Sequence, residues 1–197
     1  TQLENVTPEA SLAHPTWKMG PKITIDCATL MNKGFEVIEA VRLFGVDVEQ
    51  VDVLVHRQSI IHSMVEYIDN TVIAQLGAPD MRVPIQYALT WPDRMVSPAK
   101  KLNLLDCQPL TFHKPDMETF TCLKDGIEAA KRGGLYPCIF NAANEQAVEL
   151  FLQDKIGYLD IFRAVHESLN HFTADDYSTV EEVLEQDKQT RAFVRQL

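Results

Sequence analysis

The segment KITIDCATLMNKGFE, residues 22–36, is the most informative part of this 197-residue chain. Residues 22–25 are rich in β-branched side chains, which predicts the end of a short strand. Residues 34–45 predict a helix that closes at a glycine. The polar residues of the segment are therefore expected just after a strand and at the start of a helix.

Three polar side chains at this predicted helix start, Asn32, Lys33 and Glu36, are spaced i, i+1 and i+4. In a helix, Asn32 and Glu36 lie on one face about one turn apart. An ammonium and an amide beside a helix N-terminus suit a phosphate, and a carboxylate one turn further suits a divalent cation or a proton. The spacing leaves a second interpretation open: Glu36, Glu39 and Arg42 recur every three residues, as on a solvated helix face with an ordinary Lys33–Glu36 ion pair.

Composition excludes several classes of partner. A net charge of −10 and a pI near 5.0 argue against nucleic acid or an anionic membrane as the main partner. No apolar run approaches the roughly 18 residues of a membrane span, and residues 1–10 do not have the composition of a signal peptide. The four cysteines have no metal-finger spacing and fit a reducing compartment. We therefore expect a cytoplasmic protein, with an organelle left open as the alternative.

The first half of the chain alternates helical and strand patterns. Strands are predicted at residues 51–56, 61–68 and 71–76, and Asp69-Asn70 suits a tight turn that makes the last two strands antiparallel. Asp80 predicts the cap of a helix that stops at Pro92. The expected fold is α/β, in an α+β-like arrangement with a mixed or antiparallel sheet.

The second half predicts helices alone. Residues 91–116 are polar and proline-interrupted, which indicates a connector. The helical segments that follow, about 117–131, 136–152, 158–172 and 178–196, predict a small bundle. The expected organisation is thus a first portion at 1–90, a connector at 91–116 and a helical bundle at 117–197. Residues 1–20 indicate no element of their own, so we expect a chain that belongs to something longer.

The loop HPTWKMG, residues 14–20, is a candidate lid. Trp17 and Met19 are large apolar side chains placed before a polar site, where a lid would exclude water. The alternative is that both simply anchor the loop to the body of the protein. His14, the loop's only imidazole, could donate to a phosphate or carry a proton.

Two other groups of polar residues favour structural roles. His56 and His62 are six residues apart, a spacing that matches no helical metal pair, although Ser59 between them could face the phosphate residues. The amides of NAANE, residues 141–145, are expected to cap or bridge helices.

Five sequence blocks together resemble the 1-deoxy-D-xylulose 5-phosphate reductoisomerase family. In chain order they are HPTWKMG, DCATLMNKGFE, HRQSIIHSM, GAPDMRVP and NAANE. The match extends from about Val6 into the helical tail and covers the later part of that enzyme. The family's NADPH-binding domain, with its glycine-rich loop, and a D-x-E segment with two further metal-binding carboxylates have no counterpart in these residues.

The resemblance implies an NADPH-dependent enzyme that rearranges a 2-keto sugar phosphate and reduces the resulting aldehyde. It also implies Mg²⁺ or Mn²⁺ as the metal and a homodimer as the assembly. By the resemblance, Glu36 is a metal ligand that also touches the substrate, and Asn32 and Lys33 hold the phosphate together with residue 27.

The resemblance assigns the lid residues as well. His14 would contact the substrate, Trp17 would cover it, and Met19 and Gly20 would approach the nicotinamide. Glu36 and His14 are thus the candidate catalytic residues. The site implied by the family would be only partly supplied by this chain, so we expect these 197 residues to be inactive alone.

The chain departs from the family pattern at two positions. Cys27 stands where the family usually has serine, and a thiol is a weaker and longer donor to phosphate. Arg57 stands where proline is common, and it adds a positive charge. A different class of function also stays open, a non-catalytic dimerisation or interaction module derived from the enzyme.

Overall fold

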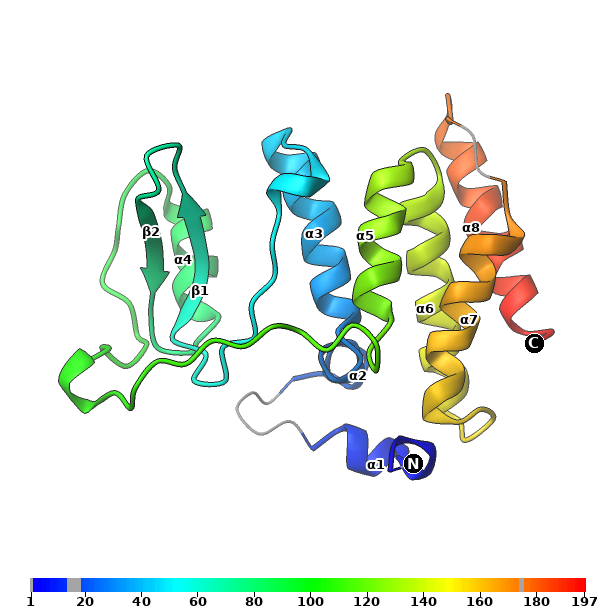
Figure 1. Ribbon diagram of the computed structural model, residues 1–197, viewed down its shortest axis with the longest axis horizontal. Helices are drawn as coiled ribbons and strands as arrows, with labels where there is room; N and C mark the ends of the chain where they lie inside the picture. Colours follow the sequence, from blue (N-terminus) through cyan, green and yellow to red (C-terminus); the bar gives the residue numbers. More distant parts are fainter. Residues whose placement is uncertain (1, 14–18, 174–175) are drawn as a thin grey trace. The chain divides into compact units, whose positions relative to one another are not determined.

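The computed structural model describes residues 2–13, 19–173 and 176–197 (Figure 1). The chain forms two compact units. One contains residues 1–53 together with 116–197, and the other contains residues 54–115. Each unit is described by itself below.

The first unit is helical. Its long helices pack in sequence, with α3 on α5, α5 on α6, and α6 on both α7 and α8 (Figure 1). The elements are η1 (Leu3–Asn5), α1 (Pro8–Ser11), α2 (Pro21–Ala28), α3 (Met31–Phe44), η2 (Val48–Gln50), α5 (Cys122–Arg132), α6 (Tyr136–Leu152), α7 (Tyr158–His171) and α8 (Val180–Val194).

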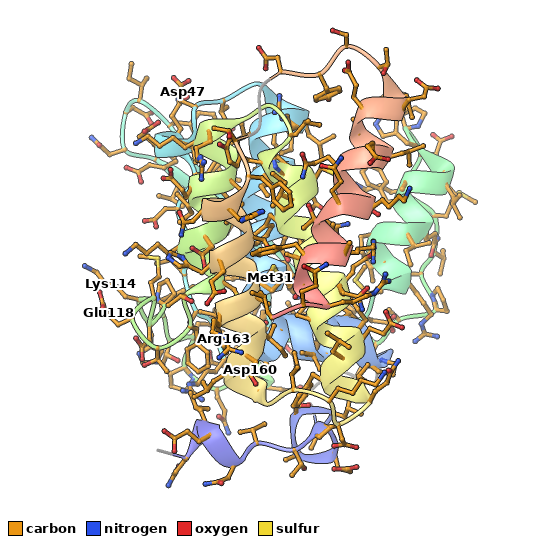
Figure 2. The ribbon with its side chains drawn as sticks, turned by 90° about the vertical axis from the view of Figure 1, so that its right-hand side faces the viewer. Met31, Asp47, Lys114, Glu118, Asp160 and Arg163 are labelled. Atoms are coloured by element: carbon orange, nitrogen blue, oxygen red, sulfur yellow. The ribbon has the colours of Figure 1, made fainter. Side chains whose placement is uncertain are left out.

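Helix α6 is the centre of this unit because it packs against α5, α7 and α8. Its buried side chains include Ile139, Phe140 and Phe151, each at most 1% exposed. Met31, at the start of α3, is also fully buried and lies among the helices in Figure 2. Each such side chain contributes about 1.5–3 kcal/mol through removal from water. In contrast, Asp160 and Arg163 form an ion pair of 3.0 Å on the surface of α7 (Figure 2).

Two glycines allow α3 and α5 to approach closely. A Cβ atom added to Gly126 would lie 2.5 Å from the Cα atom of Gly34. A Cβ atom added to Gly34 would lie 2.9 Å from Cζ of Phe140 and 3.2 Å from the carbonyl oxygen of Cys122. Carbon atoms pack at about 3.5–4.0 Å, so only glycine fits at this crossing without a shift of the helices. The crossing fixes α3 against the bundle.

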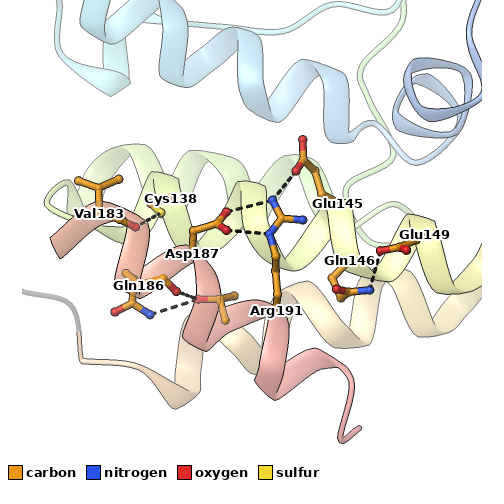
Figure 3. A network of polar contacts seen from close by, with 9 residues as sticks. Cys138, Glu145, Gln146, Glu149, Val183, Gln186, Asp187 and Arg191 are labelled. Carbon is orange, nitrogen blue, oxygen red and sulfur yellow. Dashed lines mark hydrogen bonds and ion pairs between the residues drawn. The ribbon is translucent and has the colours of Figure 1, made fainter. Parts of the chain in front are cut away.

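Polar contacts join α6 to α8 (Figure 3). The Arg191 guanidinium donates to Glu145 on α6 at 2.5 Å, and its Nε atom donates to Asp187 at 2.7 Å. On the same helix, the buried Gln186 amide donates to the Thr190 hydroxyl at 3.1 Å. Helix α8 begins at a capping box in which the Thr179 hydroxyl accepts from the Glu182 N–H.

The second unit contains an antiparallel hairpin, β1 (Ile61–Glu66) and β2 (Val72–Leu76), followed by α4 (Arg82–Thr90) and η3 (Leu104–Asp106). The turn uses Asp69 and Asn70, and Asn70 adopts a left-handed φ of 65°. The Asp69 carboxylate accepts from the Thr71 N–H at 2.9 Å. The predicted hairpin and its turn are therefore confirmed, as is a helix that ends before Pro92. Its N-cap is Met81 rather than the predicted Asp80, although the Asp80 carboxylate accepts from the Arg82 N–H at 3.0 Å.

The predicted fold class is confirmed as well, since an antiparallel sheet portion is followed by a helical bundle. The predicted helices of the second half all form, although α5 begins at Cys122 rather than near residue 117. None of the described helices combines the length and the apolar character that crossing a membrane requires.

Three expectations about local structure are wrong. Residues 22–25 are not a strand but lie within α2, where Pro21 opens the helix and Ile25 enters the core. Residues 51–56 form no strand, and only Val55 bridges to His113. The first 20 residues contain η1 and α1, with the Thr7 hydroxyl accepting from the Ala10 N–H.

The compact units also differ from the predicted segments 1–90, 91–116 and 117–197. Residues up to Val53 belong with the helical bundle, because α3 packs on α5. As the limits of domains in a complete enzyme, the predicted segments stay a prediction.

Candidate phosphate and metal site

A sharp corner between α2 and α3 positions the candidate residues. Helix α2 ends at Ala28 and α3 begins at Met31, with Leu30 between them in the left-handed region at a φ of 59°. The buried Thr29 hydroxyl donates to the carbonyl of Ile25 at 3.0 Å and accepts from the Met31 N–H at 3.4 Å. These local bonds satisfy backbone groups that the two helix ends would otherwise leave without partners.

The corner brings the three predicted polar side chains together. The Asn32 amide donates to Oε1 of Glu36 at 2.6 Å, and the Lys33 ammonium donates to Oε2 of the same carboxylate. The Lys33 and Glu36 side chains are 40% and 46% exposed, so an incoming ligand can reach both. The predicted spacing on the first turns of a helix is confirmed. The chemical roles of these residues stay a prediction.

Cys27 lies on α2 beside this corner, half-buried in an open hollow of about 410 Å³. Thr24, Ala28 and Tyr158 line the same hollow. Burial raises the pKa of the Cys27 thiol, and the positive charge of Lys33 offsets only part of that effect. The group is therefore a neutral thiol near pH 7, which is a weak hydrogen-bond donor.

The carboxylate of Glu36 fits a hard cation as one oxygen ligand. Both of its oxygens are held by donors from Asn32 and Lys33, which orients the group, and its exposure leaves lone pairs accessible. Among the residues that the structure describes, no three histidine, cysteine, aspartate or glutamate side chains gather closely enough to hold a metal ion. A metal role for Glu36 stays a prediction.

Two hydrogen bonds, one buried and one partly buried, tie the corner to the C-terminal helices. The Asn144 amide on α6 donates to Oδ1 of Asp26 at 2.9 Å, and the other Asp26 oxygen pairs with Lys22 at 2.6 Å. The Tyr158 hydroxyl on α7 donates to the carbonyl of Ala28 at 2.9 Å. The expectation that the amides of residues 141–145 bridge helices is confirmed for Asn144.

Comparison with known proteins decides the family. The model described as "DXP reductoisomerase C-terminal domain" matches residues 76–193, and a second, described as "1-deoxy-D-xylulose 5-phosphate reductoisomerase C-terminal domain", matches residues 1–44. A curated 1-deoxy-D-xylulose 5-phosphate reductoisomerase of Bacillus cereus (strain AH187) is 55% identical over 194 residues, which are 98% of this chain and 51% of the relative. The chain belongs to the 1-deoxy-D-xylulose 5-phosphate reductoisomerase family. The Clostridium tetani (strain Massachusetts / E88) reductoisomerase is 53% identical over 99% of the chain and 51% of its own length.

Solved reductoisomerase structures show the same fold. The Zymomonas mobilis enzyme in complex with NADPH has a TM-score of 0.90 at 45% identity, covering 99% of this chain and 50% of that one. A second reductoisomerase, in complex with NADPH, fosmidomycin and magnesium, has a TM-score of 0.93 at 40% identity, again covering 99% of this chain and 50% of that one. The chain thus spans about half the length of the reductoisomerases that it matches.

The lid residues predicted by the reductoisomerase resemblance are only partly described. His14 and Trp17 lie outside the described residues, so their roles stay predictions. Met19 is half-buried and Gly20 is exposed. Gly20 caps α2, and its carbonyl accepts from the backbone N–H and the hydroxyl of Thr24. Met19 and Gly20, which the resemblance would place near the nicotinamide, therefore lead directly into the helix that carries Cys27.

The histidines of the HRQSIIHSM block make contacts within the second unit. Nδ1 of His56 lies 2.9 Å from the carbonyl oxygen of Thr111, and the ring stacks on Phe112. Nε2 of His62 lies 2.9 Å from the carbonyl oxygen of Ser59. These contacts agree with the interpretation of both histidines as structural residues.

Sequence reasoning did not single out Asp26 or Tyr158 as contributors to the site. Asp26 is the one charged residue in the largely apolar segment ITIDCATLM, residues 23–31, and is only 1% exposed; a charged residue in such a segment is a signal of a buried polar contact. Tyr158 gave no comparable signal, because its partner is a backbone carbonyl 130 residues away.

Proposed function

We propose that this chain is part of an NADPH-dependent reductoisomerase that converts 1-deoxy-D-xylulose 5-phosphate to 2-C-methyl-D-erythritol 4-phosphate. The reaction belongs to non-mevalonate isoprenoid biosynthesis. The observation that carries the proposal is the grouping of Asn32, Lys33 and Glu36 on the first turns of α3, in a chain of this family.

In the proposed mechanism, the α2–α3 corner binds the phosphate of the substrate. The Lys33 ammonium supplies a positive charge and the Asn32 amide supplies a neutral donor, both near the N-terminus of α3. Substrate phosphate would compete with the Glu36 carboxylate for these donors, which frees that carboxylate for a cation. Cys27 adds a weak third contact from α2. Binding at a group remote from the reacting carbons orients them for the chemical step.

Glu36 would be a ligand of Mg²⁺ or Mn²⁺ and would contact the substrate. When bound, such a cation polarises a carbonyl oxygen and stabilises negative charge that develops on it. The similar reductoisomerase solved with fosmidomycin, NADPH and magnesium supports this part of the proposal. The remaining metal ligands would come from a part of the enzyme outside these 197 residues.

The lid residues complete the proposal. His14 would contact the substrate and serve with Glu36 as a catalytic residue, Trp17 would cover the substrate, and Met19 and Gly20 would approach the nicotinamide of NADPH. Closure of large apolar side chains over the site would exclude water from the reactive intermediate. We further propose that the protein works as a homodimer in the cytoplasm.

The test is NADPH oxidation, followed by absorbance, with 1-deoxy-D-xylulose 5-phosphate and Mg²⁺. A complete protein that contains these residues should oxidise NADPH only when both substrate and metal are present, and residues 1–197 alone should not. Absence of substrate-dependent oxidation by the complete protein would overturn the proposed function. Turnover by the 197 residues alone would show that the site is complete within them.

A further inference from the structure

The end of α2 is held from the C-terminal bundle at two points that flank Cys27. Asp26 accepts from Asn144 of α6, and the carbonyl of Ala28 accepts from the Tyr158 hydroxyl of α7. The two donors lie 118 and 130 residues further along the chain than their acceptors. Neither donor belongs to the residues that would touch phosphate or metal.

The hydrogen bond from Asn144 to Asp26 is buried. Asn144 is 0% exposed and Asp26 is 1% exposed, so water cannot replace the amide if it is removed. Oδ1 of Asn144 is buried and has no hydrogen-bond partner among the described residues, so the side chain is held through the hydrogen bond from its amide nitrogen to Asp26. Without it, the buried Asp26 carboxylate would retain Lys22 as its partner. A buried carboxylate that loses one of its two partners is less well compensated, which favours its movement toward solvent.

Movement of Asp26 would be transmitted to the candidate site. Cys27 follows it directly, and Thr29 of the corner bonds back to the carbonyls of Ile25 and Asp26. The Tyr158 ring packs edge-to-face on Phe162, with centroids 5.5 Å apart, so removal of its hydroxyl alone leaves the ring in place. The corner therefore depends on two separable donors.

We propose that Asn144 and Tyr158 are positioning residues for the phosphate-binding corner, Asn144 acting through Asp26 and Tyr158 through the Ala28 carbonyl. The inference rests on the proposed function for the identity of the ligand. It assigns the C-terminal bundle a part in substrate affinity, beyond packing.

The experiment compares Asn144→Ala and Tyr158→Phe with Gln186→Ala in the complete protein. Gln186 is the matched control because it is also a buried amide on the bundle, and its side chain bonds to Thr190 within α8. The KM for 1-deoxy-D-xylulose 5-phosphate should rise about tenfold in Asn144→Ala and several-fold in Tyr158→Phe, with kcat changed less than about twofold. Gln186→Ala should lower Tm without a change in KM.

A second readout does not depend on turnover. Amide hydrogen exchange at residues 27–33 should become faster in Asn144→Ala and Tyr158→Phe but not in Gln186→Ala. If wild type fails to turn over, the proposed function is wrong, and the exchange measurement still decides whether the two residues position the corner. Unchanged exchange at residues 27–33 in both variants, or a KM that rises equally in Gln186→Ala, would overturn the inference.

Discussion

Substitution of Gly126 by alanine tests whether the crossing of α3 and α5 holds the candidate site in place. The added Cβ would lie 2.5 Å from the Cα atom and 3.1 Å from the carbonyl carbon of Gly34, and 3.1 Å from Cζ of Phe140. Because the nearest atoms belong to backbone, no side-chain rotation relieves the overlap. Since carbon atoms pack at about 3.5–4.0 Å, α3 must move outward by about 1 Å.

The net effect on stability follows from two opposing contributions. Overpacking of a close contact costs about 1–3 kcal/mol, and alanine favours a helix interior over glycine by about 1 kcal/mol. Because the overlap is with the backbone of Gly34, we expect the free energy of unfolding to fall by about 1–2 kcal/mol in total. This loss lowers Tm by about 2–8 °C for a unit of this size. The same movement displaces Asn32 and Lys33 on α3, so the KM for substrate should rise as well.

Thermal unfolding and substrate kinetics of the complete protein measure both effects. Gly157→Ala is the matched control, because its added Cβ meets only Oδ2 of Asp160, at 3.4 Å, and its φ of −81° suits any residue. The control should leave KM unchanged and stability within about 1 kcal/mol of wild type. A Gly126→Ala protein that is as stable as wild type and has the wild-type KM would refute the reasoning.

Three further predictions concern single side chains. Cys27→Ser should hold or lower the substrate KM, since a hydroxyl is a stronger donor; a clear rise measured in steady-state kinetics would show that the thiol is adapted to its place. Burial raises the pKa of Asp125 above its ordinary 3.8, although the hydrogen bond with His166 opposes this effect. Folding therefore favours the neutral form of Asp125, and the free energy of unfolding falls as pH rises through the raised pKa. Between pH 4 and pH 7, the free energy of unfolding measured in urea should therefore fall less in Asp125→Asn than in wild type. An equal fall in the two proteins would contradict this account. Arg191→Met should lower stability by about 1 kcal/mol through loss of its partly exposed contacts with Glu145 and Asp187, and an unchanged urea midpoint would show that these contacts add nothing.

The parts of the fold predicted correctly from sequence depend on local signals. The hairpin follows from two runs of β-branched residues joined by Asp69-Asn70, and Asn70 does adopt the left-handed conformation that such turns favour. The cluster of Asn32, Lys33 and Glu36 follows from helical spacing alone. Each of these features involves residues within about one turn or one hairpin of each other.

The parts that were missed depend on contacts between distant residues. The β-branched run at residues 22–25 is helical because Ile25 is buried against the bundle and the Thr24 hydroxyl bonds to the Gly20 carbonyl. Strand propensity is a weak preference that such packing overrides. The grouping of residues 1–53 with the C-terminal helices depends on the contact of Gly34 with Gly126, which a single sequence does not reveal.

The most direct test of the central claim, that the α2–α3 corner is a phosphate and metal site, is a comparison of Glu36→Gln with Glu39→Gln. Both residues are exposed carboxylates on α3, three positions apart, so the two variants share every general effect of a lost charge. In the complete protein, kcat/KM for 1-deoxy-D-xylulose 5-phosphate should fall at least about a hundredfold in Glu36→Gln, with a higher Mg²⁺ requirement. It should stay within about twofold of wild type in Glu39→Gln. Equal activity and equal Mg²⁺ dependence in the two variants would contradict the account.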